Sequence, residues 1–323
     1  ADCCQTVIKD LPLIWTKRSR IRSKNPKNGV PVKITDVKVV LIPYPAANPA
    51  FKWREGLNIN NGFGSSPAGT AGFLLIETDE GFTGIAAVGN GVILEDYVNR
   101  RLRQMLLGKD PLDREYFYEQ IWEIDRIERF PAWMLGIVDV ALWDIAGKIA
   151  GKPLHVLLGN AGRDKVRAYA SLLRYGNPAD VARNAAEAVR RGYRDIKLHE
   201  IDLGCIRAAR SAVPSDIPLM LDINCAWDSE ADALDFCDAV KNLGIAWVEE
   251  PTWPPEDHMA MARERSASPG AIAAGENASN PEDFCRMIEA GAAGILQPSV
   301  TKVGGLTAML EVAELAQGAG LRV

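Results

Sequence analysis

The sequence predicts an α/β protein in which a TIM-like (β/α) barrel follows an N-terminal α+β capping domain. From residue 166 onward, short apolar runs alternate with helical segments at intervals of about 25 residues, which is typical of parallel βα units. Several of the intervening helices begin at Asn-Pro or Ser and end at Gly. No Gly-x-Gly-x-x-Gly turn follows the first of these strands, so the pattern favours a barrel over an open dinucleotide-binding sheet.

Length and composition limit the possible classes of protein. The chain has 323 residues, 47% of them hydrophobic, which at roughly 150 residues per domain indicates about two domains. A net charge of -5 and a pI near 5.4 leave no basic field for nucleic acid. No run approaches the roughly 18 apolar residues of a membrane span, and the N-terminus shows no signal-peptide pattern. We therefore expect a cytoplasmic homo-oligomer with no nucleic-acid or membrane partner.

The first half of the chain is expected to contain an extension and the capping domain. Residues 1–33 carry a basic patch and scattered Pro and Gly without a sustained period, so we interpret them as an N-terminal extension. The capping domain is expected over residues 34–162. Alternating apolar residues predict one strand after Ile34 and a hairpin over 73–88 that turns at 79–81. Helical periodicity follows at 94–107, 113–128 and 133–150.

A stretch rich in Gly, Pro, Asn and Ser, residues 45–70, separates the first strand from the hairpin. A segment of this length without regular structure is typical of a lid or a binding loop. Lys52 and Arg54 lie in it and are candidates for contact with the distal end of a polar substrate. A solvated loop face is the alternative interpretation of these two cations.

Residues 163–323 are expected to form the barrel domain. The strand candidates are 166–170, 195–199, 218–223, 246–250, 272–276, 294–298 and 321–323. Because a closed barrel of this type has eight strands, we expect that the C-terminal strands are missing from this sequence; the alternative is that the final strands come from elsewhere. We expect the natural polypeptide to continue past Val323.

Acidic residues close three successive strands of the predicted barrel: Asp222, Glu249 and Glu276. Active sites of parallel barrels lie at the carboxyl ends of the strands, so these carboxylates should come together. Each pair at 4–5 Å would repel by roughly 3–4 kcal/mol at an effective dielectric of 20, and oxygen-only ligands favour Mg²⁺ as the cation between them. Any one of these acids alone is more often a helix cap or a surface ion pair. Glu250 is expected to face away from the ion.

Two basic side chains close the second strand. Its period of two places Lys197 and His199 on the face toward the barrel interior. A buried cationic Lys197 should lower the pKa of His199 and leave a neutral imidazole that can act as a general base. A core histidine satisfied by a neighbour is the alternative. Asn224 lies on the same face as Asp222 and is a candidate for contact with the substrate.

These residues resemble the enolase superfamily, specifically its mandelate racemase and muconate lactonizing enzyme branch. The resemblance covers about residues 34–323 and depends on the opening at Ile34, the helix 139–148, the turn 157–159, the strand 169–171 and the three strand-end acids. It implies that Asp222, Glu249 and Glu276 are the Mg²⁺ ligands. It also implies a capping domain whose loop closes over the barrel mouth.

Two departures from the family pattern bear on the reaction. The second strand ends Lys197-x-His199 where many members have Lys-x-Lys, so an imidazole replaces the usual base lysine. Ser299 stands where the mandelate racemase type has the Asp of a His-Asp dyad, which disfavours a two-base racemase of that type. Lys302 could replace that acid, but a lysine in such a loop is more often solvated.

We therefore expect a lyase, a Mg²⁺-dependent dehydratase of a small acid sugar. His199 would remove the proton α to the carboxylate, Lys197 would assist electrostatically, and loss of the β-hydroxyl would give a 2-keto-3-deoxy acid. A racemase or epimerase is the next alternative, followed by a cycloisomerase. A catalytically silent binding or assembly protein is the alternative from another class. The sequence does not name the sugar acid.

Overall fold

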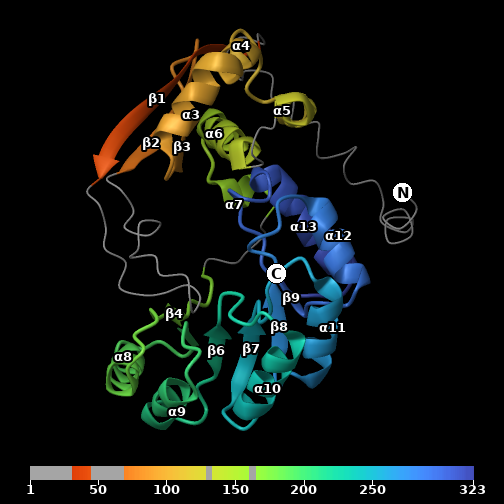
Figure 1. Ribbon diagram of the computed structural model, residues 1–323. Coiled ribbons are helices and arrows are strands. Elements are labelled where there is room, and N and C mark those ends of the chain that lie inside the picture. The colour runs from red at the N-terminus through yellow and green to blue at the C-terminus, as the bar shows by residue number, and fades with distance from the viewer. Residues whose placement is uncertain (1–30, 45–68, 129–132, 160–164) are drawn as a thin grey trace.

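The computed structural model describes residues 31–44, 69–128, 133–159 and 165–323 and contains two separate sheets (Figure 1). Within these ranges, the first sheet is antiparallel, with three strands in the order β1-β2-β3. The second is parallel, with six strands in chain order from β4 to β9. This is the predicted fold class, an α/β barrel-type sheet with an antiparallel cap.

The cap is built on alternating side chains. Its strands are β1 (Ile34–Tyr44), β2 (Gly69–Thr78) and β3 (Thr83–Val88), and along β2 every second residue from Phe73 onward is only partly buried. Its helices are α3 (Gly91–Tyr97), α4 (Arg103–Leu106), α5 (Arg114–Glu128), α6 (Trp133–Ala150) and α7 (Leu154–Leu157), and a π-helical turn, Val98–Leu102, joins α3 to α4. The buried face of the sheet and the helices α3, α4, α5 and α6 share one hydrophobic core.

The parallel sheet alternates with helices and has its own hydrophobic core. Its strands are β4 (Ala170–Ser171), β5 (Ile196–Leu198), β6 (Leu219–Asp222), β7 (Ile245–Glu249), β8 (Ala271–Ala274) and β9 (Ile295–Leu296). Its helices are α8 (Pro178–Arg190), α9 (Leu203–Ala212), α10 (Glu230–Val240), α11 (His258–Ala267), α12 (Pro281–Glu289) and α13 (Gly305–Gly318). None of the helices described is long and apolar enough to cross a membrane.

The predicted helix starts are confirmed at their caps. The side chain of Asn177 accepts hydrogen bonds from the first turn of α8, and Ser229 and Asn280 do the same for α10 and α12. Each such cap contributes about 1 kcal/mol. Because a cap fixes the residue at which each helix begins, it also fixes the loop that leads from the preceding strand end.

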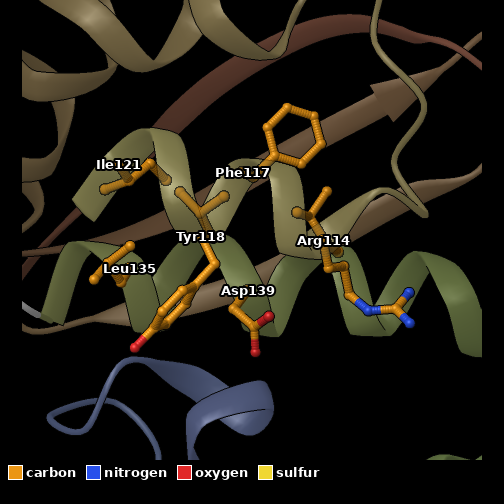
Figure 2. Close-up of a pocket in the computed structure, with 8 residues that line it drawn as sticks. Arg114, Phe117, Tyr118, Ile121, Leu135 and Asp139 are labelled. Atoms are coloured by element: carbon orange, nitrogen blue, oxygen red, sulfur yellow. The ribbon is translucent and has the colours of Figure 1, made fainter. Parts of the chain in front are cut away.

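The cap and the parallel sheet meet where α6 packs against α13. The Asp139 carboxylate on α6 accepts hydrogen bonds from the Thr307 backbone N–H (2.9 Å) and the Thr307 hydroxyl (2.6 Å). Figure 2 shows Asp139 and Tyr118 pointing from α6 and α5 toward the chain segment that begins α13. A cavity of about 10 Å³ between α5 and α6 adjoins this contact, which is room for about one water molecule.

Candidate active site

Two buried carboxylates and one lysine lie together at the carboxyl ends of β5, β6 and β7. The strand register places Asp222 beside Glu249, and each of these side chains is only 4% exposed. Lys197 Nζ lies 2.7 Å from Asp222 Oδ2 and 3.5 Å from Glu249 Oε2. The structure therefore brings these three residues together at the edge of the sheet that the sequence predicts.

Lys197 is a buried cation, as the sequence predicts. Burial alone would lower its pKa, but the negative charges of Glu249 and Asp222 outweigh burial and raise the pKa above its usual value. The ammonium also lies 5.6 Å from the centre of the Tyr169 ring, within range of a cation–π interaction. Its positive charge is thus fixed between two carboxylates and an aromatic face.

His199 differs from the sequence-based expectation. Its Nδ1 contacts the Leu172 carbonyl oxygen, and its Nε2 lies 3.0 Å from Asp222 Oδ2. Burial lowers the pKa of His199, but the hydrogen bonds to Asp222 and Leu172 outweigh burial and raise it above 6.5. Lys197 does lower the pKa of His199, as predicted, but it is the smallest of these influences, so the expected net lowering to a neutral imidazole was wrong. Since both partners only accept hydrogen bonds, this arrangement favours the imidazolium.

The pKa values of the two buried carboxyl groups shift in opposite directions. Burial, and after it the charge of Asp222, raises the pKa of Glu249 to about 7, although Lys197 opposes this. Burial also acts to raise the pKa of Asp222, but the bonds to His199 and Lys197 lower it below its usual value. A further positive charge beside Glu249 would therefore be stabilising.

Glu276 is not brought into this group. Its Oε1 lies 3.0 Å from Lys302 Nζ, which also donates to Asn277 Oδ1, and both Glu276 and Lys302 are nearly half exposed. Lys302 is thus ion-paired, whereas the sequence favours a solvated residue. In the ranges the structure describes, no three His, Cys, Asp or Glu side chains are close enough to hold a metal ion.

The donor set nevertheless suits Mg²⁺. Asp222, Glu249 and Glu276 follow three adjacent strands and offer only carboxylate oxygens, which this ion prefers. The pKa of Glu249 is raised, so an additional positive charge near its carboxylate would stabilise the ionised form. A half-exposed ion pair such as that of Glu276 with Lys302 contributes at most about 1 kcal/mol, so Glu276 can exchange partners at small cost.

Glu250 makes contacts that differ from those of Glu249. Its carboxylate accepts hydrogen bonds from Asn277 Nδ2 (2.7 Å) and from the Gly275 backbone N–H (3.4 Å), and the residue is 3% exposed. Its φ of 42° lies in the left-handed region, which turns the chain after Glu249. Glu250 thus links the ends of β7 and β8.

Arg174 and Glu200 also lie at the site and were not predicted from the sequence. Arg174 follows β4, and its guanidinium donates to the His199 carbonyl. Glu200 is 1% exposed and accepts from the Tyr175 backbone N–H at 2.6 Å. Both residues lie just after a strand, and this position could have identified them. The sequence-based prediction applied that criterion mainly to acidic residues at the ends of the third to fifth strands. Of the predicted substrate contacts, Asn224 donates to Asp222 Oδ1 (2.7 Å), whereas Lys52 and Arg54 lie outside the described residues.

Two hollows formed by described residues lie away from these side chains. One is the small cavity beside Asp139, and a shallow second one lies at the opposite ends of β4 and β5, near Arg167, Arg191 and Arg194. Neither of these two is lined by a predicted site residue.

Comparison with known proteins identifies the family. Residues 59–159 match the N-terminal domain of mandelate racemase and muconate lactonizing enzyme, and residues 180–323 match the enolase C-terminal domain-like family. The chain is 32% identical to D-galactarolactone cycloisomerase from Agrobacterium fabrum over 265 residues, covering 77% of this chain and 68% of that protein. It is also 32% identical to D-galactonate dehydratase from Ralstonia pickettii over 264 residues, covering 76% and 68%.

A solved structure supports the same assignment. The structure of D-glucarate dehydratase from Agrobacterium tumefaciens complexed with magnesium superimposes with a TM-score of 0.77 and 28% identity, over 90% of this chain and 79% of that chain. Its fold thus agrees with the cap and the parallel sheet described above. From these matches, together with the strand-end carboxylates, this chain belongs to the enolase superfamily, in the mandelate racemase and muconate lactonizing enzyme branch.

Proposed function

We propose that this protein is a Mg²⁺-dependent acid-sugar dehydratase. The observation that carries the proposal is the arrangement at the ends of β5 and β6, where His199 Nε2 and Lys197 Nζ both approach Asp222 Oδ2. One imidazole beside a fixed cation provides a single proton-transferring group. A dehydration needs one such group, because the group that removes the α-proton can return it to the leaving hydroxyl.

We assign Mg²⁺ binding to Asp222, Glu249 and Glu276. The similar D-glucarate dehydratase is complexed with magnesium, and the donor set of this chain fits the ion on the grounds given above. When bound, Mg²⁺ supplies positive charge that offsets the negative charge developing on the substrate carboxylate.

In the proposed reaction, neutral His199 removes the proton from the carbon α to the carboxylate. The electrons of that C–H bond move toward the carboxylate, and Lys197 stabilises the resulting negative charge. They then form the carbon–carbon double bond of an enol as the β-carbon–oxygen bond breaks. The proton held by His199 passes to the departing hydroxide, which leaves as water. The enol takes a solvent proton at the β-carbon and becomes a 2-keto-3-deoxy acid.

His199 must release a proton before this reaction begins. In the structure, the hydrogen bond to Asp222 is the first of the interactions that raise the pKa of His199. Any positive charge that neutralises Asp222 weakens this effect and favours the neutral imidazole. Deprotonation of His199 and binding of Mg²⁺ are thus coupled through the carboxylate of Asp222.

A second candidate function follows from Lys302. This cation lies at Glu276, after β9, whereas His199 lies at the end of β5. Two proton-transferring groups at separate places along the sheet edge would suit a racemase or epimerase. The similarity to D-galactarolactone cycloisomerase likewise supports a cycloisomerase as an alternative.

The experiment is a screen of aldonic and aldaric acids, and of their lactones, with excess Mg²⁺. We expect at least one acid to give a 2-keto acid, and we expect EDTA to abolish the reaction. Inversion at the α-carbon without loss of water would support an epimerase, and conversion of a lactone without loss of water would support a cycloisomerase. Mg²⁺ binding without turnover of any acid would support a silent binding protein and contradict the proposal.

A further inference from the structure

One guanidinium ties together the strand ends that carry the proposed site. Arg174 lies three residues beyond the end of β4 and is partly buried. Its Nε donates to the His199 carbonyl oxygen, and its Nη2 lies 3.3 Å from the Ile223 carbonyl oxygen and 3.4 Å from Asn224 Oδ1. Arg174 therefore connects the end of β4 to the ends of β5 and β6.

The chain that Arg174 contacts after β6 is strained. Asn224 and Cys225 have φ values of 52° and 53°, in the left-handed region that residues with a Cβ seldom adopt. The Cys225 backbone N–H donates to the Glu250 carbonyl (2.8 Å) on one side, and Arg174 holds Ile223 and Asn224 on the other. These contacts stabilise a turn that would otherwise relax to an ordinary conformation.

Arg174 also determines which way the Asn224 amide points. A guanidinium can only donate hydrogen bonds and an ionised carboxylate can only accept them. The Asn224 oxygen must therefore face Arg174, and its NH₂ group must face Asp222 Oδ1, at 2.7 Å. Through this amide, Arg174 orients one oxygen of the Asp222 carboxylate.

The second Asp222 oxygen is oriented through His199. Three hydrogen bonds join the loop after β4 to the end of β5. The Leu172 carbonyl oxygen accepts from His199 Nδ1, and Arg174 donates to the His199 carbonyl oxygen. Glu200 accepts from the backbone N–H of Tyr175, the residue after Arg174. This arrangement turns His199 Nε2 toward Asp222 Oδ2. Both oxygens of Asp222 thus depend on groups that Arg174 contacts.

We propose that Arg174 is a positioning residue that orients Asp222, through Asn224 and His199, for metal binding and proton abstraction. Its catalytic part rests on the proposed function. A lysine would not replace it, because three acceptors on two strand ends match a planar fork and not a single ammonium. Side chains that orient metal ligands typically change metal affinity or activity 10–100-fold when they are replaced.

The test compares Arg174→Met and Arg174→Lys with the matched control Arg167→Met in the full chain. Arg167 precedes the same strand, and it pairs with Asp195 at the opposite end of the sheet. The dissociation constant for Mg²⁺ is measured by calorimetry, and deuterium uptake of the peptide covering 223–227 is measured by hydrogen-exchange mass spectrometry. Melting curves identify any variant that fails to fold.

We expect both Arg174 variants to bind Mg²⁺ at least about tenfold more weakly and to take up deuterium faster at 223–227, and we expect Arg167→Met to match the wild type. For a substrate found in the screen, kcat should fall more than KM rises. Wild-type affinity and uptake in Arg174→Met would overturn the proposal. Full rescue by Arg174→Lys would also overturn it, since charge alone would then suffice.

These readouts separate this inference from the proposed function. If no acid is turned over, the proposed function fails, whereas Mg²⁺ affinity and deuterium uptake still decide the role of Arg174. If the wild type binds no Mg²⁺, the role of Arg174 in metal binding is overturned, and uptake at 223–227 decides only whether Arg174 holds the turn after β6. A wild-type dehydratase in which Arg174→Met changes neither affinity nor uptake would keep the function and remove this role.

Discussion

The protonation of His199 depends on the balance among its neighbours and not on Lys197 alone. Lys197 is shared between two carboxylates, and one of them, Asp222, is also the hydrogen-bond partner of His199. The nearest opposite charge therefore outweighs the nearby like charge, and the pKa of His199 rises. A sequence pattern shows that both charges are present, but the hydrogen bonds of His199, which only the structure shows, decide the direction in which its pKa shifts.

The replacement His199→Asn tests the base. Asparagine keeps a similar shape and hydrogen-bonding capacity but cannot take a proton, so turnover and exchange of the substrate α-proton should fall by about 10²–10⁴-fold. Mg²⁺ affinity should fall much less than turnover. His155→Asn, at an exposed histidine in α7, is the control and should keep wild-type rates. Retained α-proton exchange in His199→Asn would move the role of base to Lys197 or Lys302.

Two adjacent acids provide a matched test of the metal site. Glu249→Gln should weaken Mg²⁺ binding at least about tenfold, as measured by calorimetry, because it removes a charged ligand. Glu250→Gln should leave Mg²⁺ affinity close to that of the wild type. It should instead lower the free energy of unfolding by about 1–3 kcal/mol, because Gln can accept only one of the two hydrogen bonds from Gly275 and Asn277. The reverse pattern would mean that Glu250 is the ligand.

The sequence predicts which residues form the site more completely than it predicts which groups those residues contact. The rule that chemistry lies at strand ends was enough to select Asp222, Glu249, Lys197 and His199, and the structure brings these four together. The partner of Glu276 could not be predicted, because it depends on how the loop after β9 folds back. Backbone acceptors such as the carbonyls that Arg174 contacts leave no trace in the sequence.

At the scale of elements, the contact between α6 and the chain leading into α13 allows almost no space. A Cβ added to Gly136 would lie 2.6 Å from the Thr301 carbonyl oxygen, which is backbone and cannot turn aside. Gly136 is therefore required by this close approach, even though Gly weakens a helix by about 1 kcal/mol relative to Ala. The approach places the cap against the loop that carries Lys302.

Two glycines of α6 give a paired prediction. Gly136→Ala should lower the free energy of unfolding by about 1–3 kcal/mol, because the helix must move away from Thr301. Gly147→Ala meets its nearest atom, the Lys152 carbonyl oxygen, at 3.2 Å, so the gain in helix propensity should leave stability within about 1 kcal/mol of the wild type. Chemical denaturation measures both. Equal destabilisation would show that the contact with Thr301 is not the cause.

The buried Asp139 makes the same contact sensitive to pH. Burial raises its pKa to about 6, although the hydrogen bonds from Thr307 oppose this. Because the folded pKa exceeds the unfolded value, the stabilisation is fully present below about pH 4 and is lost as the pH rises through 6. Between pH 7 and pH 5 the wild type should therefore gain about 1 kcal/mol relative to Asp139→Asn, measured by denaturation at both values. No change in this difference would contradict the assignment.

The starts of helices could be predicted from the sequence where a capping residue marks them. The cap residues Asn177, Ser229 and Asn280 are of this kind, and each bonds as expected. The continuous helical pattern over 94–107 is instead divided by the π-helical turn Val98–Leu102. A single wider turn changes the hydrogen bonds but hardly changes the apolar spacing, so periodicity did not reveal it.

At the scale of the whole molecule, two hydrophobic cores position one site. The parallel sheet lines up the strand ends that bear the charged side chains, and the cap packs against the sheet domain through α6 and α13 (Figure 1). The fold class could be predicted because the βα pattern recurs with every strand. The reaction could not be fixed in the same way, because similar relatives include both a dehydratase and a cycloisomerase.

The most direct test of the account is the fate of the α-proton and of the β-hydroxyl in a single reaction. The chain is incubated with Mg²⁺ in deuterium oxide, with an acid selected by the screen and with the corresponding lactone, and the products are followed by proton NMR and mass spectrometry. A dehydratase predicts loss of one water from the acid, loss of the α-proton, and one deuterium at the β-carbon of a 2-keto-3-deoxy product. A product that retains the water, formed by epimerisation of the acid or by isomerisation of the lactone, would contradict it.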